Sequence, residues 1–310
     1  MSATFIAGDW GTTRLRLALC RDREVLARAE GPGVAETKDP ADAFASATAA
    51  WSDHRAAPAV LCGMVGSTLG WVETPYIECP VDVDRLAAGL VRFDHEGRPV
   101  AIAPGLACEN MLGAPDVMRG EETQILGAVA LSRDRDVGRH LFCLPGTHNK
   151  WALVEDGRVV RFHTTLTGEL FATLRDHSVL GRDTAGLTPA VDDAFARGLD
   201  RAFDPRRPAL GHLLFEARSR RLRERMSAGD ALSFLSGVTI GADVAGMLDL
   251  LPAPGPVIVV GAPALGKGYA AALARAGVDA VSVDGDAAAL AGLEALAAAA
   301  GLLEEPRDRS

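Results

Sequence analysis

The sequence predicts an α/β protein built from two related halves, and three observations support this prediction. A strand, a Gly-Thr turn and a second strand occur within residues 5–19 and again within 140–154, about 135 residues further on. Segments with strand and helix periodicity follow each of these units. A short apolar strand also ends in a glycine-rich loop at 59–62 and at 256–260, which is where α/β proteins usually bind ligands.

Composition limits the classes of protein to which the chain can belong. Its 310 residues, 48% hydrophobic and 24% charged, suit one large domain or two medium ones in a soluble globular protein. The net charge of −9 argues against a nucleic-acid-binding protein, which usually carries a basic face. It does not argue against an anionic ligand, because a few arginines can dominate a local site.

Cysteines and apolar segments indicate a cytoplasmic location without a membrane span. The five cysteines are widely spaced and form no CxxC or Cys/His metal pattern, which favours reduced thiols. The N-terminus shows no basic-then-apolar leader. The longest apolar stretch, 287–303, contains Glu294 and is more typical of a soluble helix. The sequence leaves a homodimer open.

The first turn carries groups that suit phosphate binding. Leu15, Leu17 and Leu19 alternate with polar or small residues after the turn, as in a half-buried strand. The turn itself offers one carboxylate, a glycine that allows close approach of the backbone, and two hydroxyls: Asp9, Gly11, Thr12 and Thr13. A carboxylate that holds Mg2+ through water, beside N–H and O–H donors, suits a nucleotide's phosphates. An ordinary polar hairpin turn is the alternative.

The remaining elements follow from local signals. Asp39-Pro40 predicts the start of a helix, and Gly120 precedes a helix whose first turn holds Glu121 and Glu122. Further segments are predicted as a turn at 145–151, a basic helix at 210–226, a small-residue helix at 230–250, a glycine loop at 261–266, a strand at 278–283 and a helix from 286.

These elements predict two packed lobes, since no low-complexity linker separates them. The first lobe is expected at 1–116 and the second at 117–310, with the C-terminal helix 286–303 as a candidate to pack back on the first. A cleft is expected between the two Gly-Thr turns.

Together, the turns and the loop at 261–266 resemble the phosphate-1, phosphate-2 and adenosine motifs of the actin/Hsp70/sugar-kinase ATPase superfamily. A narrower set of motifs resembles the 2-dehydro-3-deoxygalactonokinase family over nearly the full chain: Asp9-Trp-Gly-Thr-Thr13, Gly63-Met-Val-Gly-Ser67, Met118-Arg-Gly-Glu-Glu-Thr-Gln124, Leu144-Pro-Gly-Thr-His-Asn-Lys-Trp151, Thr167-Gly-Glu-Leu170 and Phe234-Leu-Ser-Gly237. The resemblance implies a duplicated ribonuclease-H-like (actin-like ATPase) fold with two lobes and a central cleft.

The same resemblance implies ATP-dependent phosphorylation of 2-dehydro-3-deoxy-D-galactonate at its 6-hydroxyl, in galactonate catabolism, with ATP and Mg2+ as cofactors. Such chemistry needs in-line positioning, neutralisation of phosphate charge and a carboxylate near the attacking hydroxyl. A kinase of another sugar acid or polyol is one alternative. A non-catalytic ATP-binding protein of the same superfamily is another, and ADP-dependent sedimentation would indicate a filament former.

By this resemblance, Asp9 organises Mg2+, and both turns cradle the phosphates through Gly11, Thr12 and Thr13 and through Gly146, Thr147 and His148. Gly261 and Ala262 would lie against the nucleoside. The segment 261–267 also has the spacing of a P-loop, but Gly268 replaces the Ser/Thr that a P-loop needs for Mg2+.

The catalytic base is expected among two neighbouring glutamates. Related carbohydrate kinases place a catalytic aspartate after a glycine at the start of a helix, and Gly120-Glu121 occupies that place here. The glutamate is one methylene longer, which leaves Glu122, or neither residue, as alternatives to Glu121.

A sugar-acid substrate needs a cationic partner and hydrogen-bond donors. The candidate residues for this contact are Arg14, Arg16, Arg119, Lys150, Gly66, Ser67 and Trp71. Arg14 and Arg16 share one strand face and are otherwise ordinary exposed charges, and Trp71 is otherwise a core aromatic.

Overall fold

The computed structural model describes residues 4–22, 24–206 and 208–303, and the chain divides into two compact units. Unit 1 consists of Met1–Gly138, Val154–Phe162 and Gly285–Ser310, and unit 2 consists of Arg139–Leu153 and His163–Asp284. The division therefore differs from the predicted boundary after residue 116. Residues 117–138 and the C-terminal helix both belong to unit 1.

Unit 1 is built on a six-stranded sheet with the order β3-β2-β1-β4-β7-β6. Strand β1 is antiparallel to β2 and parallel to β4, and β4 is parallel to β7. The strands are β1 (Phe5–Trp10), β2 (Arg14–Arg21), β3 (Glu24–Pro32), β4 (Ala59–Gly63), β6 (Val91–His95) and β7 (Arg98–Ile102).

The rest of unit 1 is a small sheet and a set of helices. The small sheet has the order β5-β8-β9, with β5 (Tyr76–Glu78), β8 (Gly105–Glu109) and β9 (Pro115–Met118). The α-helices are α1 (Pro40–Thr48), α2 (Val83–Ala88), α3 (Glu121–Ala130) and α10 (Gly285–Ala299). As predicted, Asp39 caps α1, accepting hydrogen bonds from the amides of Ala41 and Asp42.

Unit 2 contains most of a five-stranded sheet with the order β12-β11-β10-β13-β14. The strands are β10 (Arg139–Leu144), β11 (Asn149–Glu155), β12 (Arg158–Thr165), β13 (Val257–Gly261) and β14 (Ala280–Asp284). Strand β13 is parallel to both β10 and β14. The hairpin end of β11 and β12, Val154–Phe162, is assigned to unit 1.

The two large sheets repeat one topology. In the first sheet, β1 lies between β2 and β4, with β3 outside β2 and the parallel strand β7 outside β4. In the second sheet, β10 lies between β11 and β13, with β12 outside β11 and the parallel strand β14 outside β13. The first and second strands are joined by the Gly11-Thr12 turn in one sheet and by the Gly146-Thr147 turn in the other. This repeat is the duplicated ribonuclease-H-like fold that the sequence predicted.

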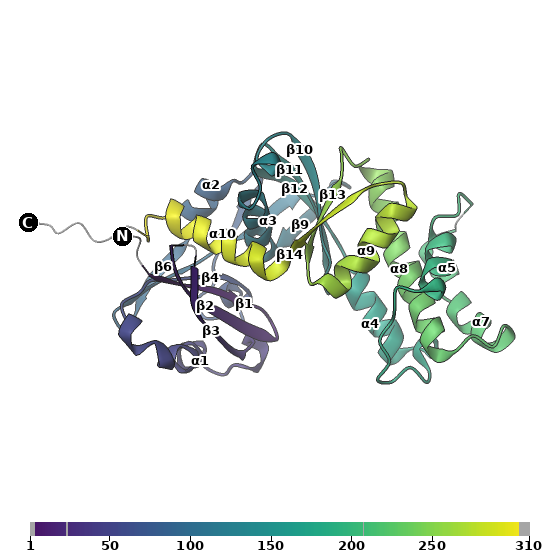
Figure 1. The fold of residues 1–310 in the computed structure, drawn as a ribbon, viewed down its shortest axis with the longest axis horizontal. Coiled ribbons are helices and arrows are strands. Elements are labelled where there is room, and N and C mark those ends of the chain that lie inside the picture. The colour runs from purple at the N-terminus through teal and green to yellow at the C-terminus, as the bar shows by residue number, and fades with distance from the viewer. Residues whose placement is uncertain (1–3, 23, 207, 304–310) are drawn as a thin grey trace, which may run out of the picture. The chain divides into compact units, whose positions relative to one another are not determined.

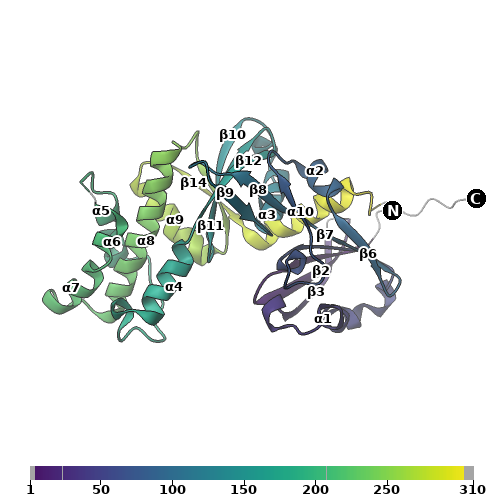
Figure 2. The same cartoon turned by 180° about the vertical axis from the view of Figure 1, so that it is seen from behind.

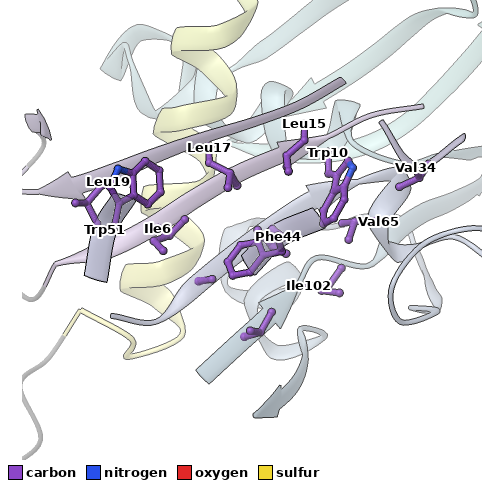
Figure 3. Packing of buried hydrophobic residues seen from close by; sticks show 13 residues of the cluster. Ile6, Trp10, Leu15, Leu17, Leu19, Val34, Phe44, Trp51, Val65 and Ile102 are labelled. Atoms are coloured by element: carbon purple, nitrogen blue, oxygen red, sulfur yellow. The ribbon is translucent and has the colours of Figure 1, made fainter. Parts of the chain in front are cut away.

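One hydrophobic cluster of unit 1 packs around its large sheet. Trp10, Leu15, Leu17 and Phe44 are each no more than 2% exposed and pack in one cluster (Figure 3). The predicted alternation in β2 is confirmed over its first four residues, because Leu15 and Leu17 are buried between exposed arginines. Each large apolar side chain that is fully buried in this way contributes about 1.5–3 kcal/mol.

Helices α3 and α10 pack with their backbones in contact, which explains why residues 117–138 belong to unit 1 (Figure 1). A Cβ on Gly127 of α3 would lie 1.8 Å from the carbonyl oxygen of Ala288, and one on Gly292 of α10 would lie 2.0 Å from that of Thr123. Only glycine permits so close an approach at both positions.

The helices of unit 2 gather around the long helix α8 (Figure 2). They are α4 (Thr167–His177), α5 (Asp193–Ala202), α6 (Leu210–Leu213), α7 (Glu216–Arg223), α8 (Ala228–Leu250) and α9 (Pro263–Arg275). The single helix predicted at 210–226 is thus two, α6 and α7. Within the described residues, α8 alone is long and apolar enough to span a membrane, and it is mostly buried within the protein, as the core helix of a soluble domain is.

Candidate functional site

The first Gly-Thr turn is held in place by its own backbone and by a neighbouring segment. The Gly11 amide donates to the carbonyl of Arg14 (2.9 Å), and the Val34 amide donates to the carbonyl of Gly11 (3.1 Å). Thr12 and Thr13 are exposed at the tip of the turn. These exposed side chains are open to a ligand, and the phosphate-binding role of this turn stays a prediction.

Asp9, near the end of β1, is part of a small charge cluster. Arg16 Nη1 lies 3.2 Å from Asp9 Oδ2 and 3.5 Å from Asp286 Oδ1. Burial raises the pKa of Asp9, and the Arg16 guanidinium opposes this shift. Arg16, a predicted substrate residue, thus neutralises Asp9 in this structure. The sequence assigned Asp286 only to the start of the last helix, because nothing local links it to Asp9.

Gly63 brings Asp9 close to the start of α3. A Cβ on Gly63 would lie 3.3 Å from Asp9 Oδ1, and a Cβ on Gly120 would lie 3.2 Å from the Cα of Gly63. Both glycines have positive φ, +91° and +107°, a backbone conformation that other residues rarely adopt. The end of β4 therefore sits between the Asp9 carboxylate and the Gly120-Glu121 turn.

Glu121 and Glu122 have different surroundings. Glu121 is partly exposed, and its Oε2 accepts a hydrogen bond from the amide of Arg119 (3.2 Å). Glu122 is 0% exposed, with Oε2 at 2.6 Å from the Gly120 amide nitrogen and Oε1 at 3.2 Å from the Thr123 hydroxyl. Burial, followed by the Glu121 charge, raises the pKa of Glu122 to about 8. Glu121 is the one that a substrate can reach.

Arg119 is fixed beside the loop that follows β4. Its guanidinium donates to both the hydroxyl and the carbonyl oxygen (2.8 Å) of Thr74, and it lies 4.5 Å from the centre of the Tyr76 ring. A Cβ on Gly66 would lie 3.0 Å from Arg119 Nη1. The Ser67 hydroxyl donates to the carbonyl of Met64 (2.7 Å). Gly66 and Arg119 are thus adjacent, while Ser67 stabilises its own loop.

The other predicted substrate residues lie in different environments. Trp71 is partly buried and packs edge-on against Trp10 and Phe93 at the border of the hydrophobic cluster. Lys150 is only 5% exposed within β11. Arg14 is exposed at the start of β2.

The second Gly-Thr turn is packed against the start of α4. A Cβ on Gly168 would lie 2.2 Å from the carbonyl oxygen of Gly146, and the Glu169 amide donates to the carbonyl of Thr147 (2.9 Å). His148 Nε2 lies 2.6 Å from Glu169 Oε2, with both side chains about half exposed. The three predicted phosphate residues of this turn therefore share one edge of unit 2 with a helix N-terminus, where the helix dipole favours anions.

Gly261 and Ala262 line a cavity of about 260 Å³ at the ends of β13 and β14. Gly261 also lies near the second turn, since its Cβ would be 3.7 Å from the carbonyl oxygen of Pro145. Helix α9 begins at Pro263, inside the segment that has P-loop spacing. A helix there leaves no loop to wrap a phosphate, which supports rejecting the P-loop interpretation.

Asp243 on α8 is a further candidate that sequence reasoning missed. Its carboxylate accepts hydrogen bonds from side chains of β11, β12, α4 and α9. One signal could have revealed it: Asp243 is the only charged residue between Asp230 and Asp249 in an otherwise small and apolar helix.

Comparisons with known proteins agree on one family. Residues 9–296 match the sequence model of the family described as 2-keto-3-deoxy-galactonokinase. The chain is 39% identical to the "Probable 2-dehydro-3-deoxygalactonokinase" of Rhizobium meliloti (strain 1021), over 95% of this chain and 97% of that protein. It is 36% identical to the 2-dehydro-3-deoxygalactonokinase of Escherichia coli (strain K12), over 96% and 98%.

A solved structure shows the same similarity in three dimensions. The crystal structure of a Sinorhizobium meliloti protein, described there as a 2-dehydro-3-deoxygalactonokinase, superposes with a TM-score of 0.87 at 37% identity. The superposition covers 95% of this chain and 98% of that one.

Proposed function

The chain belongs to the 2-keto-3-deoxy-galactonokinase family, and from this premise we propose that it transfers the γ-phosphoryl group of ATP to the 6-hydroxyl of 2-dehydro-3-deoxy-D-galactonate. This reaction belongs to galactonate catabolism. The observation that carries the proposal is the convergence of Asp9, Gly63 and Gly120-Glu121 at one edge of unit 1. A metal-organising carboxylate and a reachable base carboxylate are the two groups that this chemistry requires.

Glu121 is assigned the role of general base. It would accept the proton of the 6-hydroxyl as the oxygen attacks the γ-phosphorus and ADP leaves. Its partial exposure supports this role, whereas the carboxylate of Glu122 is buried and bonded to the Gly120 amide. Glu122 instead shapes the turn that presents Glu121.

Asp9 is assigned to Mg2+. Among the residues that the structure describes, no group of three or more His, Cys, Asp or Glu side chains could hold a metal ion. Mg2+ does not require such a group, since it usually keeps several waters and is held by one or two carboxylates and the substrate's phosphates. When bound, Mg2+ would neutralise phosphate charge. Arg16 would hold Asp9 ionised and oriented before the ion arrives, because it lies 3.2 Å from that carboxylate.

The substrate's carboxylate is assigned to Arg119 beside Gly66. Arg119 is positioned by Thr74 and Tyr76, and the Arg119 backbone amide contacts Glu121. A carboxylate bound by this guanidinium would lie beside Gly66, whose Cβ would be 3.0 Å from Arg119 Nη1. Arg16 is less suited to this contact, because its charge is already shared between two aspartates.

In unit 2, the Gly146-Thr147-His148 turn is assigned to the phosphates of ATP, and the cavity at Gly261 and Ala262 is assigned to its nucleoside. The proximity of Gly261 to Pro145 supports this pairing. We assign the protein to the cytoplasm, since its five cysteines all lie in the described part of the chain and are free.

The test of this function is a substrate screen with coupled detection of ADP. We expect Mg2+-dependent turnover with 2-dehydro-3-deoxy-D-galactonate and a new phosphate ester at C6 by 31P and 13C NMR. Turnover with another sugar acid or polyol, but not with this one, would replace the substrate assignment. Binding of ATP without turnover on any acceptor would contradict the proposal of a kinase.

A further inference from the structure

Five side-chain donors converge on the carboxylate of Asp243 in unit 2. Oδ1 accepts from the Trp151 indole, and Oδ2 accepts from an amide and three hydroxyls. The donor–acceptor distances are 2.9 Å for Trp151 Nε1, 2.9 Å for Asn149 Nδ2, 3.1 Å for Thr165 Oγ1, 2.7 Å for Thr167 Oγ1 and 2.7 Å for Tyr269 Oη. One carboxylate therefore ties α8 to four other elements.

Neutral groups satisfy this charge. Within the described part of the chain, Asp243 forms no ion pair with a lysine, arginine or histidine nitrogen at 4.0 Å or less. Burial, and then the Asp243 charge, raises the pKa of Tyr269 well above its usual range, so its hydroxyl stays a donor. The five donors hold the Asp243 carboxylate in one orientation, and two of them, Asn149 and Thr167, belong to segments next to the Gly146-Thr147-His148 turn.

The network holds both flanks of the Gly146-Thr147-His148 turn. On one side, Asn149 follows His148 directly. On the other side, Thr167 is the first residue of α4, and the next two residues of α4 contact the turn, Gly168 through its Cα and Glu169 through its amide. On each side of the turn, one hydrogen bond joins Asp243 to a residue that lies next to the turn or within two residues of a contact with it.

We propose that Asp243 is the positioning residue of this phosphate turn. It fixes Asn149 and the start of α4 so that the backbone amides of the turn are aimed before a nucleotide arrives, and it acts through these residues without touching the nucleotide. The inference rests on the proposed ATP-binding role of the turn. A carboxylate that only holds the core together would affect every ligand of unit 2 equally, whereas a positioning residue affects those with phosphates.

The test is Asp243→Asn, with dissociation constants for ADP and for adenosine measured by calorimetry. The substitution keeps the size of the side chain but turns an acceptor oxygen into an NH2 group that faces other donors. We expect affinity for ADP to fall at least 10-fold and affinity for adenosine to change less than twofold. Asp249→Asn is the matched control, because it removes the same charge from an exposed position of the same helix.

A second pair of variants tests the path itself and remains informative if Asp243→Asn fails to fold. Thr167→Val removes the hydroxyl at nearly constant volume, and Thr167→Ser keeps it. Thr167→Val should lower ADP affinity selectively, Thr167→Ser should restore it, and the double variant with Asp243→Asn should lose less than the sum of the two losses.

The outcomes separate this inference from the proposed function. The positioning role alone is overturned if the wild-type protein binds ADP and the two variants, Asp243→Asn and Thr167→Val, bind ADP as tightly as wild type. It is also overturned if the variants lose affinity for ADP and for adenosine to the same extent. A wild-type protein that binds neither ATP nor ADP overturns the proposed function and this inference together.

Discussion

Oε2 of Glu122 lies 2.6 Å from the amide nitrogen of Gly120, and the Glu122 side chain is completely buried. Its neighbour Glu121 instead accepts from the Arg119 amide and is partly exposed. Two adjacent glutamates in the first turn of α3 thus have different surroundings. Glu122 is bonded to the Gly120 turn inside the unit, and Glu121 carries a partly exposed side chain.

This division predicts opposite outcomes for two isosteric variants. Glu121→Gln should lower kcat by about 10²–10⁴-fold, the usual contribution of a general base, with the dissociation constant for ATP unchanged. Glu122→Gln keeps a carbonyl oxygen that can accept from the Gly120 amide, so kcat should stay within about threefold of wild type. Coupled ADP detection and calorimetry measure both quantities. Near-normal turnover of Glu121→Gln would refute the assignment of the base.

Stability should fall as pH rises, because of Glu122. Its pKa is about 8 in the folded protein and about 4.3 when unfolded. Below about pH 4 both states are protonated and Glu122 has no effect. Between about pH 4 and 8 the unfolded state alone releases a proton, so the free energy of unfolding decreases, by an amount on the order of a few kcal/mol. Above about pH 8 the loss is complete.

Urea denaturation at pH 5, 7 and 9 measures this dependence, with Glu122→Gln as the comparison. The glutamine does not titrate, so the variant should gain stability relative to wild type as pH rises. Parallel pH profiles for the two proteins would show that Glu122 is already ionised in the folded state at neutral pH.

Asp9→Asn should impair the use of Mg2+. The amide keeps the shape of the side chain but removes the charge that attracts the ion. We expect kcat to fall at least about 100-fold and the Mg2+ concentration for half-maximal rate to rise, while ADP binding without Mg2+ changes little. Calorimetric titrations of ADP with and without Mg2+ provide the measurement. Equal Mg2+ dependence in both proteins would exclude Asp9 as the metal organiser.

Arg16→Gln should move the acidic limb of the pH–rate profile to higher pH. Burial raises the pKa of Asp9 and Arg16 opposes this, so removing the guanidinium raises that pKa further and Asp9 becomes protonated earlier on acidification. The measurement is kcat/KM from pH 5 to 8. Arg21→Gln, an exposed change at the other end of β2, should leave the limb in place. If both variants behave like wild type, the ion pair does not set the ionisation of Asp9.

Two Gly→Ala variants should have opposite effects on stability. The Cβ of Gly168→Ala would lie 2.2 Å from the carbonyl oxygen of Gly146, so the phosphate turn must shift. We expect a loss of about 1–3 kcal/mol and a rise in KM for ATP of at least about 10-fold. Gly246→Ala on α8 meets no atom within 4 Å and should stabilise the helix by about 0.5–1 kcal/mol. Urea denaturation and ATP saturation curves test this pair, and a stabilising Gly168→Ala would show that the turn is adaptable.

Several features of this protein follow from local sequence. The alternation of Leu15 and Leu17 with arginines set the faces of β2, because successive side chains of a strand point to opposite sides. The Asp39-Pro40 pair marked the start of α1, since capping depends on neighbours within one turn. The paired Gly-Thr turns indicated the duplication that the two strand orders show.

Other features were decided by packing between distant segments. Gly127 and Gly292 bring α3 and α10 together, and this contact assigns residues 117–138 to unit 1, against the predicted boundary. The sequence favoured Glu121 over Glu122 only by its place directly after Gly120, because both stand in one helical turn. Their different burial depends on what covers them. Asp243 draws its donors from four other elements. Periodicity and turn residues report local geometry, whereas burial and hydrogen-bond partners depend on which distant segments meet.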